Sequence, residues 1–196
     1  MQLPWPLRDE LHARRLARAR EGDAAAFRAL YRDLYPEVAR FVARRIRGRA
    51  DAEDLTARVF VAFVEKLDQY DRTRGSVRAW LFAFARNAVI DHLRAVRPSA
   101  SPEVLDLLPG DGPGPEGGLL QQEERGRLAA LVRELPPETR ELLALRFGDG
   151  LRHREIAAVL GLQEATVKQR VSRAVRDLRA RLRLAADKKG AEGALA

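Results

Sequence analysis

The feature that most constrains this chain is a break in its middle, between Arg97 and Leu119, that a helix cannot cross. Residues 98–118 hold five prolines and five glycines. Proline lacks a backbone hydrogen-bond donor and clashes with the preceding helical turn, so it ends helices. The same stretch has four acidic residues and no basic one, whereas the whole chain has a formal net charge of +8. An acidic linker rich in proline and glycine, between two basic segments, predicts two domains.

The segment before this linker has the periodicity of helices. Apolar residues recur about every 3.6 positions over Ala24–Arg47, where Pro36 should bend the helix or split it. A second helix is expected over Asp51–Leu67, with Asp51 as its N-cap, and a third over Val77–Arg94. We expect the third helix to bury Leu81, Phe84, Ala85, Ala88 and Leu93.

The segment after the linker predicts four more helices. Proline and glycine mark their ends, and we expect them over Leu120–Glu134, Glu138–Phe147, Arg152–Leu160 and Glu164–Leu184. The small polar tail from Asp187 onward should fray.

These elements predict an all-α fold of two small helical domains, at residues 24–97 and 120–184, joined by a flexible linker at residues 98–119. Residues 1–23 form an N-terminal extension, which is either disordered or packed on the first domain. Residues 185–196 form a C-terminal tail.

The charge of the chain points to a polyanionic partner. A net charge of +8 and a pI near 10.6 suit nucleic acid or an anionic membrane. A solvated, arginine-rich surface from a GC-rich genome explains the same numbers, so charge alone decides nothing. High arginine and glutamate would also suit a thermophile.

Several classes of site have no support in the sequence. The absence of cysteine excludes disulfides and Cys-ligated zinc. His12, His92 and His153 are scattered without a shared metal spacing, and the chain has no Walker-type glycine-rich loop. We therefore expect neither an enzyme nor a bound metal or cofactor. Without a signal-like apolar run or a membrane-spanning stretch, we expect a cytoplasmic protein that does not insert into membranes.

The most specific local signal is a helix-turn-helix over Arg152–Val171. Ile156, Ala157 and Leu160 give a short helix one apolar face, and Gly161 allows the sharp turn. The second helix should bury the stripe Val167, Val171, Val175, Leu178 and Leu182. In such motifs this second helix enters the major groove of DNA.

The second helix is also strongly basic. From Ala165 to Arg183 it has seven basic residues and one acid, Asp177. Arginine and glutamine reach guanine and adenine edges, while lysine and serine contact bases or phosphates. An ordinary helical hairpin with a solvated basic face is the alternative.

Two blocks of the chain resemble sigma factors of the extracytoplasmic-function (ECF) type. The run REIAAVLGLQEATVKQRVSRA, within Glu134–Leu182, is similar to the promoter-reading hairpin of sigma domain four. The runs RADAEDLTARVFVAFVEKLDQYD and GSVRAWLFAFARNAVIDHLR resemble sigma domain two. The order of domain two, a short linker and domain four is that of the ECF group, and the resemblance covers residues 24–184.

The resemblance implies a function in transcription initiation. It implies that the chain binds core RNA polymerase, at the clamp of the beta-prime subunit and the flap of the beta subunit. It also implies that the chain recognises the −35 and −10 promoter elements and helps to open the DNA. The family further implies an anti-sigma partner, although no residue here identifies one.

In domain four, the resemblance implies contacts with the −35 element. The matching residues are Arg152, Arg154, Lys168, Gln169, Ser172, Arg173 and Arg176. Arg152 and Arg154 would hold the DNA backbone. Where relatives often carry Arg-Ser, this chain has Lys168-Gln169, which leaves its upstream preference open.

In domain two, the resemblance implies recognition and melting of the −10 element. The matching residues are Arg74, Ser76, Arg78, Trp80, Arg86, Asn87 and His92. Aromatic faces, polar groups and cations can offset the cost of unstacking a base. Trp80 is equally explained as a core residue. Asn87 is a poor helix former in mid-helix, which favours a functional role.

The helix after Asp51 resembles the surface that docks on polymerase. The matching residues are Asp54, Leu55, Arg58, Val59 and Phe63. Leu55 and Phe63 are also explained as core, and Asp54 as a favourable acid in the first helical turn.

Three other classes of protein remain as alternatives. An autonomous regulator could use the same hairpin on an operator, but the first segment lacks the α/β pattern of a phosphoacceptor domain. An enzyme lacks a recognisable site. A membrane-surface protein would need a basic helix with large exposed apolar residues.

Overall fold

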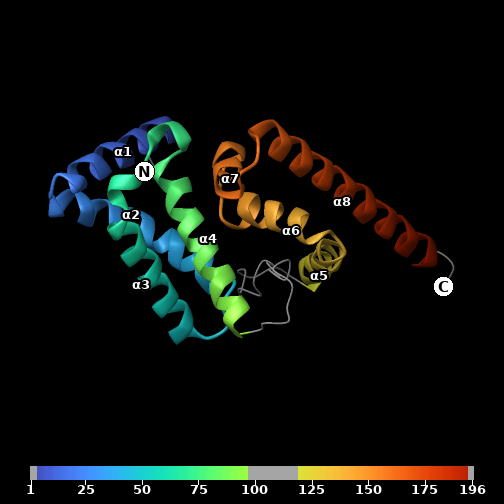
Figure 1. The fold of residues 1–196 in the computed structure, drawn as a ribbon. Coiled ribbons are helices and arrows are strands. Elements are labelled where there is room, and N and C mark those ends of the chain that lie inside the picture. Colours follow the sequence, from blue (N-terminus) through green and yellow to red (C-terminus); the bar gives the residue numbers. More distant parts are fainter. Residues whose placement is uncertain (1–3, 97–118, 194–196) are drawn as a thin grey trace.

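The computed structural model describes residues 4–96 and 119–193, and within them the side chains of residues 4–96 and 125–184 (Figure 1). Every regular element in these ranges is helical, which confirms the predicted all-α fold. Most of the predicted linker, residues 97–118, lies outside the described residues.

Four helices make up the first half of the molecule. They are α1 (Trp5–Arg20), α2 (Ala24–Ala43), α3 (Arg49–Glu65) and α4 (Val77–Val96). The side chain of Asp23 caps α2 by accepting hydrogen bonds from the backbone nitrogens of Ala25 and Ala26, each at 2.9 Å. Pro36 lies inside α2, which is not split and ends four residues before the expected boundary.

The start of α3 differs from the prediction. Gly48 occupies the N-cap position with a φ of 101°, a conformation that L side chains rarely adopt, and the helix begins at Arg49. The prediction that Asp51 is the N-cap was therefore wrong. Asp51 lies instead in the first turn, where the helix dipole favours a carboxylate.

Helix α4 packs on both sides, which the sequence pattern did not reveal. Leu81 and Ala85 are fully buried, as expected, but Phe84, Ala88 and Leu93 are only partly buried. Phe82, which was not expected in the core, is 1% exposed and meets Phe41 with 5.3 Å between ring centroids. The extra buried positions arise because α2 and α3 cover one side of α4 and α7 covers the other.

The second half consists of α5 (Leu119–Arg133), α6 (Pro137–Leu143), a π-helical turn at Ala144–Gly148, α7 (His153–Leu160) and α8 (Glu164–Gly193). The helix expected over Glu138–Phe147 thus changes from α to π in its last turn. Helix α8 continues to Gly193, nine residues beyond the predicted end at Leu184.

Helices α7 and α8 form the expected helix-turn-helix. Gly161 ends α7 in the left-handed conformation, with a φ of 66°, and the nitrogen of Leu162 donates to the carbonyl of Ala157 at 2.9 Å. At the other end of α7, the Glu155 side chain accepts from the backbone nitrogen of Arg152 at 3.0 Å. Ile156, Val167 and Val171 are buried between the two helices.

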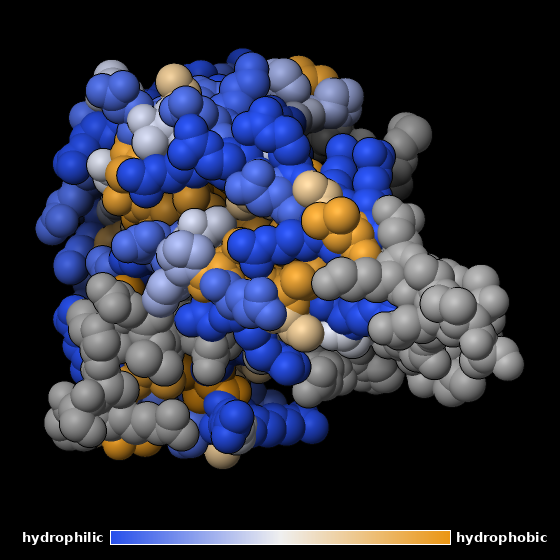
Figure 2. Space-filling view, turned by 90° about the vertical axis from the view of Figure 1, so that its right-hand side faces the viewer, coloured by the Kyte–Doolittle hydropathy of each residue, from blue (hydrophilic) through white to orange (hydrophobic). Residues whose placement is uncertain are grey.

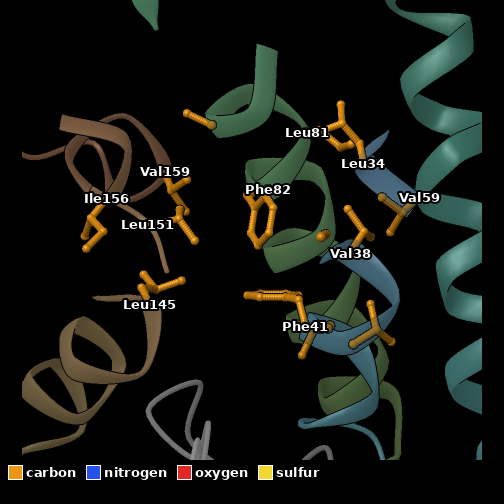
Figure 3. Close-up of a cluster of buried hydrophobic side chains, with 14 of the residues drawn as sticks. Leu34, Val38, Phe41, Val59, Leu81, Phe82, Leu145, Leu151, Ile156 and Val159 are labelled. Atoms are coloured by element: carbon orange, nitrogen blue, oxygen red, sulfur yellow. The ribbon is translucent and has the colours of Figure 1, made fainter. Parts of the chain in front are cut away.

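The two halves of the chain pack against each other in this structure. Helix α7 lies beside α4, and the buried side chains of both halves form one continuous hydrophobic cluster (Figure 3). We call this contact between the two halves the junction. Phe41 and Phe82 lie on one side of the junction, facing Leu145, Leu151 and Ile156 on the other. Figure 2 shows one face of the molecule covered largely by hydrophilic side chains, with apolar ones gathered between them.

Candidate nucleic-acid and polymerase interface

The outer face of α8 brings together five of the residues predicted to read DNA. Val167, Val171 and Ala174 are buried, so the positions between them point outward. Residues three and four apart are neighbours on a helix surface, and this spacing gathers one exposed row: Lys168, Gln169, Ser172, Arg173 and Arg176. Within the described part of the chain, no ion pair or side-chain hydrogen bond occupies them. We call these five residues the α8 stripe.

The two arginines at the start of α7 are engaged by α1. The guanidinium of Arg152 lies 3.6 Å from the ring centroid of Trp5, a cation–π contact. Arg154 forms an ion pair with Asp9. Trp5 and Asp9 come from the N-terminal extension, for which sequence reasoning offered no function, and no local pattern could have paired them with residues some 145 positions away.

Arg78 is buried at the junction between the two halves. Its Nε donates to Glu37 at 2.6 Å, its Nη1 to Glu155 at 3.0 Å and its Nη2 to the carbonyl of Asp149 at 2.9 Å. Only 4% of Arg78 is exposed. Ser76, at the start of α4, donates from its hydroxyl to Glu155 at 3.2 Å. Two residues predicted to touch the −10 element therefore contact the helix-turn-helix instead.

The charged side chains buried at this junction are stable only while each of them has a partner of opposite charge. Burial alone would raise the pKa of Glu37, but Arg78 and Arg8 outweigh that effect and hold the pKa below its usual value of 4.5. Glu155 is 1% exposed and accepts three hydrogen bonds, from the backbone nitrogen of Arg152, the hydroxyl of Ser76 and the guanidinium of Arg78. A buried charge without its partner is strongly destabilising. Loss of any one of these groups would therefore weaken the contact between the two halves.

Three further ion pairs cross the same junction. Arg86, another predicted −10 residue, makes a bidentate contact with Glu141 at 2.6 and 3.1 Å. Asp149, whose side chain is 1% exposed, accepts from Arg44 and from Arg45, the latter at 2.6 Å. The sequence did not single out Arg44, Arg45 or Asp149.

The remaining predicted −10 residues lie on α4 and the turn before it. Arg74 and Asn87 are exposed, and His92 is half-buried. Trp80 is half-buried in an aromatic cluster, with ring centroids 5.2 Å from Phe63, 5.4 Å from Tyr70 and 5.0 Å from Phe84. The Trp80 side chain thus packs on the core and keeps part of its surface accessible.

The predicted polymerase residues divide into two groups on α3. Leu55, Val59 and Phe63 are at most 2% exposed and belong to the core. Asp54 and Arg58 are exposed and form an ion pair at 3.1 Å across one helical turn. The outer face of α3 also exposes Val61 and Val64, by 57% and 44%. Sequence reasoning missed these valines because the apolar periodicity marks the buried face.

Two other kinds of feature are missing from the part of the chain that the structure describes. Across residues 4–96 and 119–193, no helix combines the length and apolar character that a membrane span requires. Among the described side chains of residues 4–96 and 125–184, no three histidine or acidic groups are placed so that they could hold a metal ion.

The chain matches two families of sigma-70 regions. Sigma-70 region 2 matches residues 30–98, and sigma-70 region 4 matches residues 125–178. The two matches follow each other along the chain, on either side of residues 99–124. Helix α1 lies before the first match.

Two curated relatives match over most of the chain. The ECF RNA polymerase sigma factor BldN of Streptomyces coelicolor is 35% identical over 164 residues, which cover 82% of this chain and 62% of that protein. The ECF RNA polymerase sigma factor RpoE of Cereibacter sphaeroides is 35% identical over 159 residues, which cover 80% of this chain and 86% of that protein. The chain thus spans less than two thirds of BldN but most of RpoE.

Solved structures share the fold. CnrH, solved in complex with the cytosolic domain of CnrY, is 26% identical with a TM-score of 0.57, and the match covers 90% of this chain and 97% of CnrH. The sigma factor RpoE of Bartonella quintana, solved with the anti-sigma factor NepR, has a similar fold at 24% identity and a TM-score of 0.54, over 80% of this chain and 96% of that one. From both matched regions and these relatives, the chain belongs to the ECF sigma factors of the sigma-70 family.

Proposed function

We propose that this chain binds core RNA polymerase and directs it to a set of promoters, which the chain recognises through a −35 and a −10 element. The observation that carries the proposal is the α8 stripe, an exposed row of donors on the second helix of a helix-turn-helix, in a chain that also has sigma region 2. The role that we propose for the chain is binding and positioning, and we assign the chain no catalytic step. Because its partners would be polymerase and DNA, we place its action in the cytoplasm.

The α8 stripe supports direct reading of the upstream element. Arg173 and Gln169 are long enough to reach base edges in the major groove, and Lys168, Ser172 and Arg176 suit bases or phosphates. The stripe is free to dock in the present conformation, whereas Arg152 and Arg154 must first leave Trp5 and Asp9.

The proposed −10 function needs a change in conformation. Arg74, Asn87 and part of Trp80 are accessible, and these would engage the opened strand. Ser76, Arg78 and Arg86 are held by Glu155, Glu37 and Glu141. We propose that docking on polymerase separates α4 from α7, which would release these three side chains to DNA.

The proposed polymerase contact on region 2 is the outer face of α3. Asp54 and Arg58 supply charge there, and Val61 and Val64 supply apolar surface. Leu55, Val59 and Phe63 would support this face from the core. A second contact, between region 4 and the flap of the beta subunit, follows from the family.

We also propose an inhibitory protein partner of the anti-sigma class. The support is the similarity to CnrH, which was solved in complex with the cytosolic domain of CnrY. A partner of this kind would stabilise a form of the chain that polymerase cannot use.

The test is run-off transcription with purified core polymerase on a pooled genomic library from the host, with and without this chain. New transcripts that share two upstream elements at a fixed spacing would support the proposal and identify both elements. If no transcripts appear and the chain also fails to co-purify with core polymerase, an autonomous regulator becomes the better explanation.

A further inference from the structure

Helix α1 is packed against the first half of the molecule. Leu16 and His12 are each 1% exposed, and α1 packs along α2. Arg8 pairs with Glu37 and Arg15 with Asp33, so both ends of the contact between α1 and α2 are tied by charge. The first turn of α1 is therefore held in a fixed place relative to α4.

That first turn reaches across to the helix-turn-helix. The ring of Trp5 lies 3.6 Å from the Arg152 guanidinium and 5.9 Å from that of Arg154, and Asp9 pairs with Arg154. A guanidinium stacked on an indole face, or paired with a carboxylate, has to leave that partner before it can bind a phosphate. Both predicted backbone-holding arginines of region 4 are thus occupied by one turn of α1.

We propose that α1 acts as an intramolecular latch, in which Trp5 and Asp9 hold Arg152 and Arg154 and so lower the affinity of the free chain for DNA. The latch would weaken the binding of the helix-turn-helix to promoters until polymerase separates the two halves. The inference rests on the DNA-binding function of region 4. It goes beyond that function because α1 lies outside both matched regions.

The size of the effect follows from the two contacts. A cation–π contact or an ion pair at an exposed site each shifts an equilibrium by about two- to fivefold. Trp5→Ala and Asp9→Asn should therefore each raise the affinity of the free chain for duplex DNA by about two- to fivefold. Trp5→Phe keeps an aromatic face and should restore most of the lower affinity.

The experiment measures binding of the full-length chain to a fluorescent random-sequence duplex by anisotropy, at one fixed salt concentration. Asp68→Asn is the control for Asp9→Asn, because it removes the same charge from a side chain that is 87% exposed and pairs with Arg20, at the other end of α1 from Trp5. Leu7→Ala is the control for Trp5→Ala, because it shortens an apolar side chain of α1 that is 57% exposed. Circular dichroism checks that each variant is folded.

The Asp9→Asn substitution made in an Arg154→Ala chain distinguishes the latch from a general effect of charge on DNA binding. If Asp9 acts through Arg154, the gain from Asp9→Asn disappears when Arg154 is already alanine. A gain that persists in that background, or one no larger than the gain from Asp68→Asn, would overturn the latch. Because this assay needs neither polymerase nor a known promoter, its result is separate from the outcome of the transcription test.

Discussion

At the scale of single residues, Arg78 is the side chain on which contacts between the two halves converge. It joins Glu37 of α2 to Glu155 and the Asp149 carbonyl of the second half. Removing it leaves the buried carboxylate of Glu155 and the partly buried carboxylate of Glu37 short of a partner. Arg78→Ala should therefore lower the free energy of unfolding by about 3 kcal/mol, measured by urea denaturation.

The neighbouring Arg74 provides the comparison for Arg78. It is exposed on the turn before α4, so Arg74→Ala should change stability by no more than about 0.5 kcal/mol. Equal effects of the two substitutions would mean that the ion pairs of Arg78 contribute no more than a surface charge.

Arg173 is the residue of the α8 stripe with the clearest expected role in specificity. An arginine that makes two hydrogen bonds to one guanine contributes at that base pair only. Arg173→Ala should cost about 1–3 kcal/mol at one upstream position, measured by competition among promoter variants for the polymerase complex. A uniform loss on every variant would instead identify a phosphate contact.

At the scale of elements, the turn of the helix-turn-helix depends on one glycine. Gly161 has a φ of 66°, and no atom lies within 4 Å of where its Cβ would be. Gly161→Ala should therefore destabilise the protein by about 1–2 kcal/mol through the backbone alone. Gly126, inside α5, has the same open surroundings, so Gly126→Ala should stabilise the protein by about 0.5–1 kcal/mol. Thermal melts of both variants check the opposite signs.

The contact between α1 and α2 should be sensitive to pH through His12. Burial is the main cause that lowers the pKa of His12 from its usual 6.5, and Arg8 lowers it further. Asp33, whose Oδ2 lies 3.5 Å from Nε2 of His12, raises the pKa, and Arg15 lowers it. The unfolded chain then binds a proton more readily than the folded one. Stability is complete above pH 6.5 and falls as the pH drops below it, by at most about 1.4 kcal/mol per pH unit.

Urea denaturation between pH 7 and pH 5 tests this dependence. His12→Gln should flatten the slope of stability against pH. The pKa of His153 is also lowered, first by burial and then by Arg146, but this side chain is less buried, so His153→Gln should change the slope less. The pKa of Glu37 is lowered from 4.5, so its titration falls below this range. An unchanged slope in His12→Gln would assign the pH dependence to other groups.

Sequence reasoning succeeded where structure depends on near neighbours and failed where it depends on distant ones. Periodicity, proline and glycine located α4, α7 and the turn at Gly161, because these signals act within a few residues. The burial of Phe82 was missed because one helix period cannot reveal a second packing partner. The contacts of Trp5 with Arg152 and of Arg45 with Asp149 join residues more than a hundred positions apart, so no local pattern encodes them.

At the scale of the whole molecule, both apolar and charged contacts cross between the two halves, so we expect the halves to unfold together. Phe41 and Phe82 face Leu145, Leu151 and Ile156 (Figure 3). The ion pairs of Arg78, Arg86 and Asp149 also join the two halves. In the function that we propose, the chain has to break these contacts to reach both promoter elements. The junction should therefore be strong enough to make unfolding cooperative and weak enough to open on polymerase.

Phe82→Ala tests this balance. Phe82 is 1% exposed, and truncating a buried phenylalanine costs about 3–5 kcal/mol. Part of this lost stabilisation comes from contacts across the junction. Calorimetry should therefore record one unfolding transition for the parent chain and two for the variant. Phe60→Ala is the matched control: Phe60 is 5% exposed, meets Tyr31, Tyr35 and Phe63 within the first half, and should lower stability without dividing the transition. A single transition in Phe82→Ala would mean that the remaining apolar contacts and the buried ion pairs are enough to couple the halves.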